Sequence, residues 1–272
     1  MELTQLVVLI RGGGEVASGV AHRLARAHFK VCLTEIAQPL AVSRGVAFCE
    51  AIYDGKKEIE GVVARRITSA NEIPKVWQEN EIPIIVDPEA RVKKTVNPDV
   101  LVDAIIAKRN LGTKITDAPL VIGLGPGFTA GKDVHMVVET NDGENLGKVI
   151  LNGEAEKDTG IPVAIGGLTF ERVLHSPKDG LFLTNKELGD FVAAGEVVAS
   201  VASHQIKAEI GGIVRALMRS GTKVAKRTKL GEIDPTGSKK ACFTIRPKMS
   251  KIADGVLEAI LMRYNVQGVQ HD

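Results

Sequence analysis

Three consecutive glycines, Gly12 to Gly14, lie between a short apolar run and a helical pattern, and they constrain the fold more than any other feature. The run before them, Leu6 to Ile10, is rich in Val and Ile, which is typical of a strand buried on both faces of a parallel sheet. After them, apolar residues recur at three- and four-residue steps from Val16 to Ala25, which predicts an amphipathic helix. A strand, a glycine turn and a helix in this order are typical of a loop that approaches phosphate, because a helix N-terminus offers free N–H groups to an anion.

The glycines also fit a dinucleotide-binding pattern. Gly12, Gly14 and Ala17 match GxGxxA, and Lys30 to Thr34 is predicted to form a second strand. Glu35 follows that strand, 21 residues after Gly14, where a ribose-binding carboxylate is expected. A carboxylate at this position favours a free ribose 2′-hydroxyl over a 2′-phosphate.

Two charged residues make this motif a variant. Glu15 lies in the first helical turn, where it suits the helix dipole but repels a pyrophosphate. Arg11 replaces the small or apolar residue that usually precedes the first glycine. Three interpretations stay open for the segment around Gly13: a nucleotide or similar phosphate-bearing ligand, a ligand that is not a nucleotide, or a tight turn with no ligand.

Composition restricts the class of protein. The chain has 272 residues, a formal net charge of +2 from 35 basic and 33 acidic residues, and 4% aromatic residues, so no nucleic-acid partner is expected. The N-terminal apolar run is only strand-length and no basic segment precedes it, so neither a membrane span nor a signal peptide is expected, and we expect a cytoplasmic protein. The three cysteines, Cys32, Cys49 and Cys242, are most simply buried thiols, with Cys49 the better candidate for a functional one.

Strand and helix patterns alternate through the first half. Apolar runs at 61–65, 82–86 and 120–124 predict further strands, and the stretches 70–79 and 98–108 predict helices. This alternation indicates an α/β domain of Rossmann-like, doubly wound topology with a parallel sheet over residues 1–139. In such sheets, ligands bind beyond the carboxyl ends of the strands.

A second glycine loop, Gly123 to Asp133, follows the last of these strands. It is not a Walker A motif, because Pro126 occupies the position of the first required glycine. A backbone nest at Gly125 and Gly127 with Lys132 at its rim could hold an anion, and the alternative is a flexible connector.

Other polar residues near these strand ends are ambiguous. Asp87 either contacts the ligand or caps the turn at Pro88, and the sequence does not rank the two. Asp133 and His135 share one face of a predicted strand, but two side chains are too few for a metal site, so no metal is expected.

The second half changes to short Val- and Ile-rich segments separated by glycine turns, which predicts an all-β domain over residues 140–246. Within 176–235, the segment Gly180–Val201 aligns without gaps to Gly212–Ile233, which indicates an internal duplication. This region resembles the barrel-sandwich fold of biotinyl and lipoyl carrier domains.

The linking segment between the two copies does not match those carriers. Its lysine, Lys207, lies closer to the second copy than a carrier lysine should, and His204 is interpreted as a surface residue. The duplicated region is therefore expected to supply packing or a docking surface. The segment 247–272 contains a predicted amphipathic helix, Met249 to Tyr264, that either covers the first domain's sheet or pairs with another subunit in a homo-oligomer.

Four segments together resemble a known family: RGGGEVASGVAHRL from Arg11, TEIAQPLAVSRGVAFCEAIYDG from Thr34, IVDPEA from Ile85 and GLGPGFTAGKDVH from Gly123. The chain is similar to the YqeB-type accessory proteins of selenium-dependent molybdenum hydroxylase systems. These are related in role to the XdhC and CoxF maturation factors. The resemblance implies a maturation role, in which the molybdenum cofactor or its selenium-containing form is prepared for a partner hydroxylase apoenzyme. No catalytic residues can be transferred from the family.

The residues and the resemblance together predict a crevice formed by two glycine loops that binds a molybdopterin-type cofactor, or NAD. The predicted binding residues are Arg11, Gly12, Gly13, Gly14, Glu35, Asp87, Gly125, Gly127 and Lys132. In this prediction the backbone of both loops binds phosphates, Arg11 and Lys132 neutralise them, and Glu35 or Asp87 holds a hydroxyl or a pterin nitrogen. Two alternatives are an NAD-dependent oxidoreductase, for which His135 is the nearest proton-transfer residue, and a non-catalytic binding scaffold.

Overall fold

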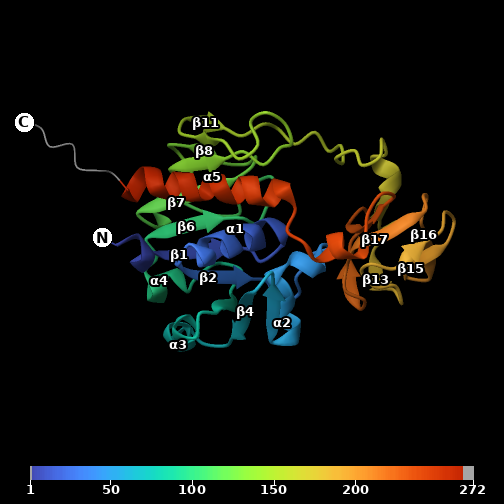
Figure 1. Ribbon diagram of the computed structural model, residues 1–272, viewed down its shortest axis with the longest axis horizontal. Coiled ribbons are helices and arrows are strands. Elements are labelled where there is room, and N and C mark those ends of the chain that lie inside the picture. Colours follow the sequence, from blue (N-terminus) through green and yellow to red (C-terminus); the bar gives the residue numbers. More distant parts are fainter. Residues whose placement is uncertain (1, 266–272) are drawn as a thin grey trace, which may run out of the picture. The chain divides into compact units, whose positions relative to one another are not determined.

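The computed structural model describes residues 2–265 and shows two compact units (Figure 1). The described part of the first unit comprises 2–37, 48–158 and 246–265, and the second unit comprises 38–47 and 159–245. The units divide at 158, whereas the predicted boundary lies at 139. The structure also places residues 38–47 in the second unit, whereas the prediction includes them in the first domain. Residues 266–272 of the predicted C-terminal segment lie outside the described residues.

The first unit is built on a nine-stranded sheet in the order β10-β9-β7-β6-β1-β2-β5-β4-β3. All neighbouring pairs from β9 to β4 are parallel, and only the edge strands β10 and β3 are antiparallel. The strand order reverses at β1, since β2 lies on one side of it and β6 on the other. The predicted α/β class with a mostly parallel sheet is confirmed.

The elements of the first unit have the following bounds. The strands are β1 (Val7–Arg11), β2 (Lys30–Glu35), β3 (Lys56–Ile59), β4 (Val62–Ile67), β5 (Ile82–Val86), β6 (Val100–Asp103), β7 (Leu120–Leu124), β8 (Thr129–Ala130), β9 (Met136–Val138), β10 (Val149–Ile150) and β11 (Gly153–Glu154). The helices are α1 (Glu15–Arg26), α2 (Ala51–Asp54), α3 (Ile73–Gln78), α4 (Lys93–Val96) and α5 (Pro247–Tyr264).

The prediction of a helix over 98–108 is wrong, because Val100–Asp103 is the strand β6. The apolar residues continue past this strand to Ala107, interrupted only by Asp103, so no Gly or Pro marks the end of the strand and the stretch resembles a buried helix. β5 and β7 have the predicted bounds, the strand predicted over 61–65 is β4 at Val62–Ile67, and β3 was not predicted.

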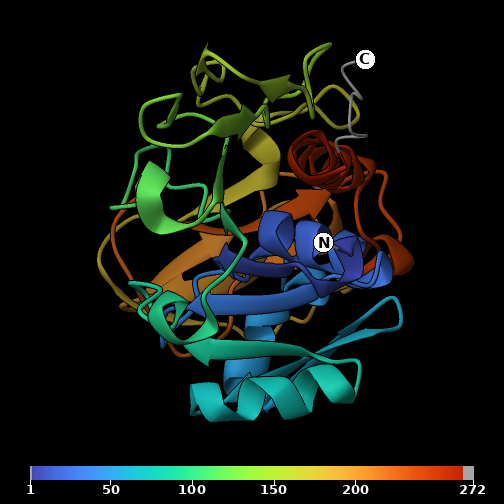
Figure 2. The ribbon, with the colours of Figure 1, turned by 90° about the vertical axis from the view of Figure 1, so that its left-hand side faces the viewer.

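Helices α1 and α5 lie side by side on one face of this sheet (Figures 1 and 2). Two glycines permit the close approach of α5 to its neighbours. A Cβ on Gly19 of α1 would lie 2.9 Å from the Cβ of Met249, and one on Gly255 of α5 would lie 2.0 Å from the carbonyl oxygen of Gly147. The C-terminal helix therefore covers the sheet of the first unit, which is the first of the two predicted alternatives.

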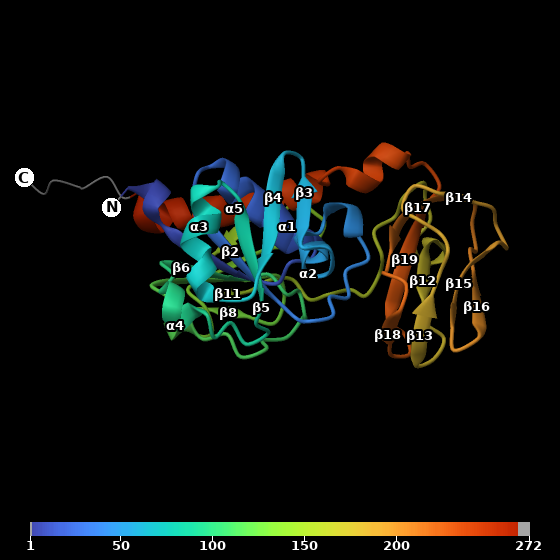
Figure 3. The same ribbon diagram turned by 90° about the horizontal axis from the view of Figure 1, so that it is seen from below.

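The second unit contains two four-stranded antiparallel sheets, β12-β19-β17-β14 and β16-β15-β13-β18 (Figure 3). The strands are β12 (Val173–His175), β13 (Gly180–Leu183), β14 (Phe191–Val192), β15 (Val197–Val201), β16 (His204–Lys207), β17 (Gly212–Leu217), β18 (Thr222–Val224) and β19 (Lys229–Asp234). The predicted antiparallel β region is thus confirmed, although its regular sheets begin only at Val173.

The strand pairing reproduces the 32-residue repeat. Gly180 of the first copy pairs with Val224 of the second. Their repeat equivalents, Gly212 of the second copy and Val192 of the first, pair in the same way. Each copy therefore places its short middle strand in the sheet that is built on the other copy. The repeat-related residues Val198, Val201, Leu230 and Ile233 are all buried in one core.

Within residues 2–265, no helix combines the length and the apolar character required to cross a lipid bilayer.

Candidate functional site

The first glycine loop lies where β1 ends, beside the end of β6. Arg11 and Asp103 are the last residues of these parallel strands and are paired in register. Because the chain leaves β1 toward β2 on one side and β6 lies on the other, this is the point at which the strand order reverses. Ligands of open α/β sheets bind at such a point, beyond the carboxyl ends of the strands.

The three glycines differ in their surroundings. Gly12 has φ +103°, and a Cβ there would lie 3.1 Å from the carbonyl oxygen of Ala104, so the loop requires glycine at this position. A Cβ on Gly13 would contact Cys49 and Ile84 at 3.1 Å. Gly14 is the N-cap of α1 with φ −69°, and nothing lies within 4 Å of its Cβ position. Gly14 therefore borders open space at the helix N-terminus.

Glu35 binds the glycine loop directly. Its Oε2 accepts a hydrogen bond from the Gly13 N–H at 2.8 Å, and its Oε1 accepts one from the Ile36 N–H at 2.8 Å. Burial raises the pKa of this carboxyl, and the two backbone N–H bonds only partly oppose that effect. The Gly13 N–H thus already has a carboxylate partner and is not free for a phosphate.

Arg11 is also engaged within the protein. Only 5% of the residue is exposed, and its guanidinium donates to Asp103 Oδ2 at 3.1 Å and to the Thr113 hydroxyl. It also donates to the carbonyl oxygens of Pro88 and Leu111. Arg11 therefore does not present a free positive charge to a ligand.

These residues surround a pocket of about 420 Å³. It is lined by Arg11, Gly12, Thr34, Glu35, Ile36, Pro88, Glu89, Ile105, Leu111 and Gly112. Small-molecule sites typically measure ~300–1,000 Å³, so a ligand of the size of a nucleoside fits this volume.

The second glycine loop does not contribute to this pocket. A Cβ on Gly127, which has φ +108°, would lie 2.6 Å from the backbone of Arg109, and one on Gly125 would lie 2.4 Å from the Thr140 hydroxyl oxygen. These glycines are required for close packing, and Lys132 is exposed. The segment 104–113 contacts both Gly12 and Gly127, so it lies between the two loops that were predicted to form one crevice.

Asp87 caps the turn after β5. Its Oδ2 accepts a hydrogen bond from the Val92 N–H at 2.7 Å, and its carbonyl oxygen accepts one from the Ala90 N–H at 3.0 Å. Of the two predicted roles, the structure shows the cap. The pocket is instead lined by the next two residues, Pro88 and Glu89.

The other candidate side chains have local partners. Asp133 accepts a bond from the Thr129 N–H, and His135 Nδ1 accepts one from the Val121 N–H at 3.0 Å. His135 directly precedes β9, so it lies at the amino ends of the parallel strands, opposite the pocket. Among the residues that the structure describes, no group of three or more His, Cys, Asp or Glu side chains could hold a metal ion.

Neither Cys49 nor His204 lines the first pocket. Cys49 is fully buried beneath the glycine loop, where its N–H donates to the Gly13 carbonyl oxygen at 2.8 Å. Burial raises the pKa of its thiol well above the ordinary value of 9.0, so the thiolate that would react is disfavoured. His204 is exposed at the start of β16 in the second unit.

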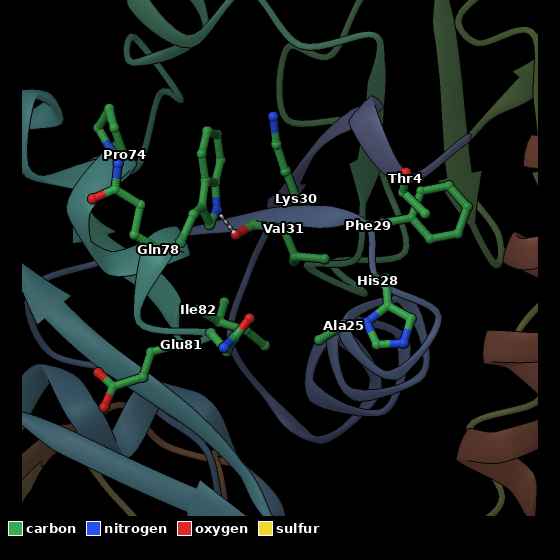
Figure 4. A pocket seen from close by; sticks show the side chains of 12 residues that line it. Thr4, Ala25, His28, Phe29, Lys30, Val31, Pro74, Gln78, Glu81 and Ile82 are labelled. Atoms are coloured by element: carbon green, nitrogen blue, oxygen red, sulfur yellow. Dashed lines mark hydrogen bonds between the residues drawn. The ribbon is translucent and has the colours of Figure 1, made fainter. Parts of the chain in front are cut away.

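A second pocket, of about 720 Å³, lies at the amino ends of β2 and β5 (Figure 4). In Figure 4, His28 stands at the end of α1, and Pro74 and Gln78 project from α3. The Trp77 indole N–H donates to the Val31 carbonyl oxygen at 2.7 Å, which fixes the ring against the sheet. Two charged residues of the lining are bonded to residues outside it: Glu81 pairs with Arg65 and Lys56, and Lys30 donates to the Gln5 side chain.

Asp103 and Thr113, which bind Arg11 but do not themselves line the first pocket, were not predicted. Both are 2% exposed, and the Thr113 hydroxyl donates to Asp103 Oδ2 at 2.6 Å. The run Val100 to Asp103 has the same form as Val7 to Arg11, namely apolar residues ending in a charge. From this similarity, two neighbouring strands that end in opposite charges could have been predicted.

The chain matches one curated relative over nearly its whole length. It is 45% identical over 264 residues to the uncharacterized protein YqeB of Escherichia coli K12, which covers 97% of this chain. The two proteins are homologous. The chain spans 49% of the length of YqeB, and no role is assigned to that protein.

Other comparisons are weaker. No protein-family model matches the chain. Solved structures that resemble it include the ectoine utilization protein EutE from Ruegeria pomeroyi, with 14% identity, 85% and 86% of the two chains covered, and a TM-score of 0.27. An aspartoacylase family protein from Mesorhizobium loti has 16% identity, covers 86% of each chain and has a TM-score of 0.28. Similarities at this level carry no argument about function.

Proposed function

We propose that this homologue of YqeB is an accessory protein of a selenium-dependent molybdenum hydroxylase, and that it binds the nucleotide part of a phosphate-bearing cofactor at Glu35 and Gly14. The cofactor would be of the molybdopterin dinucleotide type, or NAD. The first unit would then be Rossmann-like, and the duplicated second unit would be of the barrel-sandwich type.

The position of the Glu35 carboxylate carries this proposal. Two backbone N–H groups fix its orientation at the wall of a nucleoside-sized pocket. The remaining lone pairs of its oxygens can accept hydrogen bonds from ribose hydroxyls, which is the role of the acidic residue after the second strand of dinucleotide-binding folds. A 2′-phosphate would meet Glu35 and Glu89 and would be repelled.

The N-terminus of α1 supports the phosphate part of the proposal. Glu15, the acidic residue that weakened the motif, forms an ion pair with Arg246 at 2.8 Å. This pair offsets its repulsion of an anion. Gly14 has no side chain that could cap the helix, and open space lies beside it, so a phosphate can approach the first-turn N–H groups.

The two alternatives receive less support. An oxidoreductase would need a proton-transfer residue near the bound nicotinamide, and His135 lies at the opposite ends of the strands. A scaffold would use the second unit as a docking surface and leave the pocket without a ligand.

Calorimetric titration tests the binding site. We expect ADP and NAD to bind the wild-type protein, and NADP to bind at least about tenfold more weakly because of its 2′-phosphate. Gly14→Val should abolish binding without unfolding the protein, since its side chain fills only the open space. Glu35→Gln should weaken binding, whereas Glu58→Gln on the exposed side of β3 should not. Normal binding by a folded Gly14→Val variant would contradict the site assignment.

Affinity purification from native cells tests the partner. We expect the wild-type protein to retain a molybdenum hydroxylase apoenzyme together with the cofactor. The Gly14→Val variant should retain the same apoenzyme but no cofactor. Turnover of NADH by the isolated protein would instead support the oxidoreductase. A retained hydroxylase together with calorimetry that shows no nucleotide binding would support the scaffold.

A further inference from the structure

We infer that Arg11 is a positioning residue, which fixes the walls of the 420 Å³ pocket and contacts no phosphate. This inference deepens the proposed function, since the ligand in its main test is a nucleotide. It assigns the pocket a recognition mode based on the shape of the nucleoside, with phosphate charge recognised elsewhere, at the N-terminus of α1.

The contacts of Arg11 join three separate segments. One terminal nitrogen donates to Asp103 at the end of β6 and to Thr113 in the loop that follows it. The other donates to the carbonyl oxygen of Leu111 in the same loop, and to that of Pro88 after β5. Pro88 and Leu111 are themselves walls of the pocket. A single planar guanidinium therefore holds two parts of the pocket wall that come from different segments of the chain.

The loop itself is preorganised to receive these bonds. The Asn110 side chain accepts hydrogen bonds from the N–H groups of Gly112 and Thr113, both at 2.8 Å, and donates to the Thr113 carbonyl oxygen. Asp103 Oδ1 accepts a bond from the Ile105 N–H at 3.2 Å. The segment is thus tied at both ends, and Arg11 attaches it to the glycine loop.

The charge of Arg11 is compensated inside the protein. Asp103 is 2% exposed and lies in register with it, so the two form a buried ion pair bridged by the Thr113 hydroxyl. Breaking such a pair leaves an uncompensated charge, which is strongly unfavourable. A ligand phosphate would have to compete with Asp103 for the guanidinium at that cost.

One donor of Arg11 is left over. Its Nε is buried and has no hydrogen-bond partner among the described residues. An unpaired buried N–H is unfavourable, because the group has lost its hydrogen bond to water. The hydrogen bonds of the two terminal nitrogens thus determine the orientation of the guanidinium, since this orientation leaves Nε without a partner. Lysine cannot reproduce the arrangement, because it lacks the planar fork that reaches several fixed acceptors.

Titration with adenosine, AMP and ADP tests the inference on Arg11→Lys. We expect all three probes to bind more weakly by the same factor, at least about tenfold, the size seen when supporting groups behind a binding residue are removed. A loss that grows from adenosine to ADP would show that Arg11 contacts phosphate and would overturn the inference. Unchanged affinity for all three would also overturn it.

Arg172→Lys is the matched control. Arg172 is 3% exposed and forms a buried pair with Glu232 at 3.2 Å, but it belongs to the second unit. This variant should lower stability and leave the nucleotide affinities unchanged. If Arg11→Lys does not fold, Thr113→Val removes one contact and preserves the charge pair, and it should weaken the three probes equally.

Hydrogen exchange of the ligand-free protein separates this inference from the proposed function. Backbone amides of 105–113 should exchange faster in Arg11→Lys, and those of β17 should not change. If the wild-type protein binds no nucleotide, the proposed function fails, but the exchange of 105–113 still decides the role of Arg11. Unchanged exchange in this segment would overturn the inference.

Discussion

Three adjacent glycines have three different physical roles in this protein. Gly12 provides a backbone conformation and a close contact, Gly13 packs on Cys49, and Gly14 leaves space at a helix N-terminus. In the sequence these are three identical residues, so the pattern alone could not assign a different role to each. The same holds for Arg11, whose partners Asp103 and Thr113 lie about 90 to 100 positions away.

The difference between the glycines is measurable. We expect Gly12→Ala to destabilise the protein by about 1–3 kcal/mol, because φ +103° is strained for alanine and its Cβ would lie 3.1 Å from the Ala104 carbonyl oxygen. Gly14→Ala should be nearly neutral, since its φ of −69° suits any residue. Urea unfolding of both variants checks this, and equal effects would contradict it.

Glu35 gives a pH-dependent prediction. The folded protein raises the pKa of this carboxyl above its ordinary value of 4.5, so the folded state binds the proton more tightly than the unfolded state does. Stability that depends on Glu35 should therefore fall as the pH rises from below 4.5 through the raised pKa. Glu35→Gln should lack this component. Unfolding free energies of both proteins at pH 4 and pH 7.5 give the comparison, and parallel pH profiles would refute the shift.

At the scale of elements, the sequence predicts what local periodicity encodes. The bounds of β5 and β7 follow from apolar runs with flanking turns, and α5 follows from its apolar stripe. β6 was predicted as part of a helix because its apolar run continues to Ala107 with no Gly or Pro to mark the end of the strand. The two glycine loops do not form one crevice, because the segment 104–113 lies between them. The position of this segment depends on β6, which precedes it.

Helix α5 provides a test in which packing opposes propensity. Gly255→Ala should favour an isolated helix by about 1 kcal/mol. In the protein we expect it to be destabilising, because the new Cβ would lie 2.0 Å from the Gly147 carbonyl oxygen. Thermal unfolding should show a lower Tm by several degrees, whereas the exposed control Glu258→Ala should change little. A higher Tm for Gly255→Ala would show that the loop at Gly147 moves away freely.

At the scale of the whole molecule, each unit is assembled from segments that are distant in the chain. Residues 38–47 belong to the second unit, although the segments before and after them belong to the first. Within the second unit, the Val42 carbonyl oxygen accepts a bond from the Leu217 N–H at 2.8 Å, and Arg44 Nε donates to the Leu217 carbonyl oxygen at 2.7 Å. No local sequence pattern indicates that residues 38–47 leave the first unit, so the prediction assigned them to the first domain.

This excursion should stabilise β17. We expect Arg44→Met to cost about 1 kcal/mol, the usual net contribution of one hydrogen bond, and to increase hydrogen exchange in β17. The amides of β1 should keep their protection. Exchange that rises equally in β1 and β17 would mean that the variant weakens the protein as a whole.

The exchange of middle strands between the two copies of the repeat has a consequence for synthesis. β14 of the first copy pairs with β17 of the second, and β18 of the second copy pairs with β13 of the first. During synthesis, the sheet that contains β13 therefore cannot be completed until β18, which ends at Val224, has been made. The sheet that contains β17 cannot be completed until β19, which ends at Asp234, has been made. Neither copy can therefore form its native sheet alone, and completion of the duplicated region depends on synthesis of the second copy.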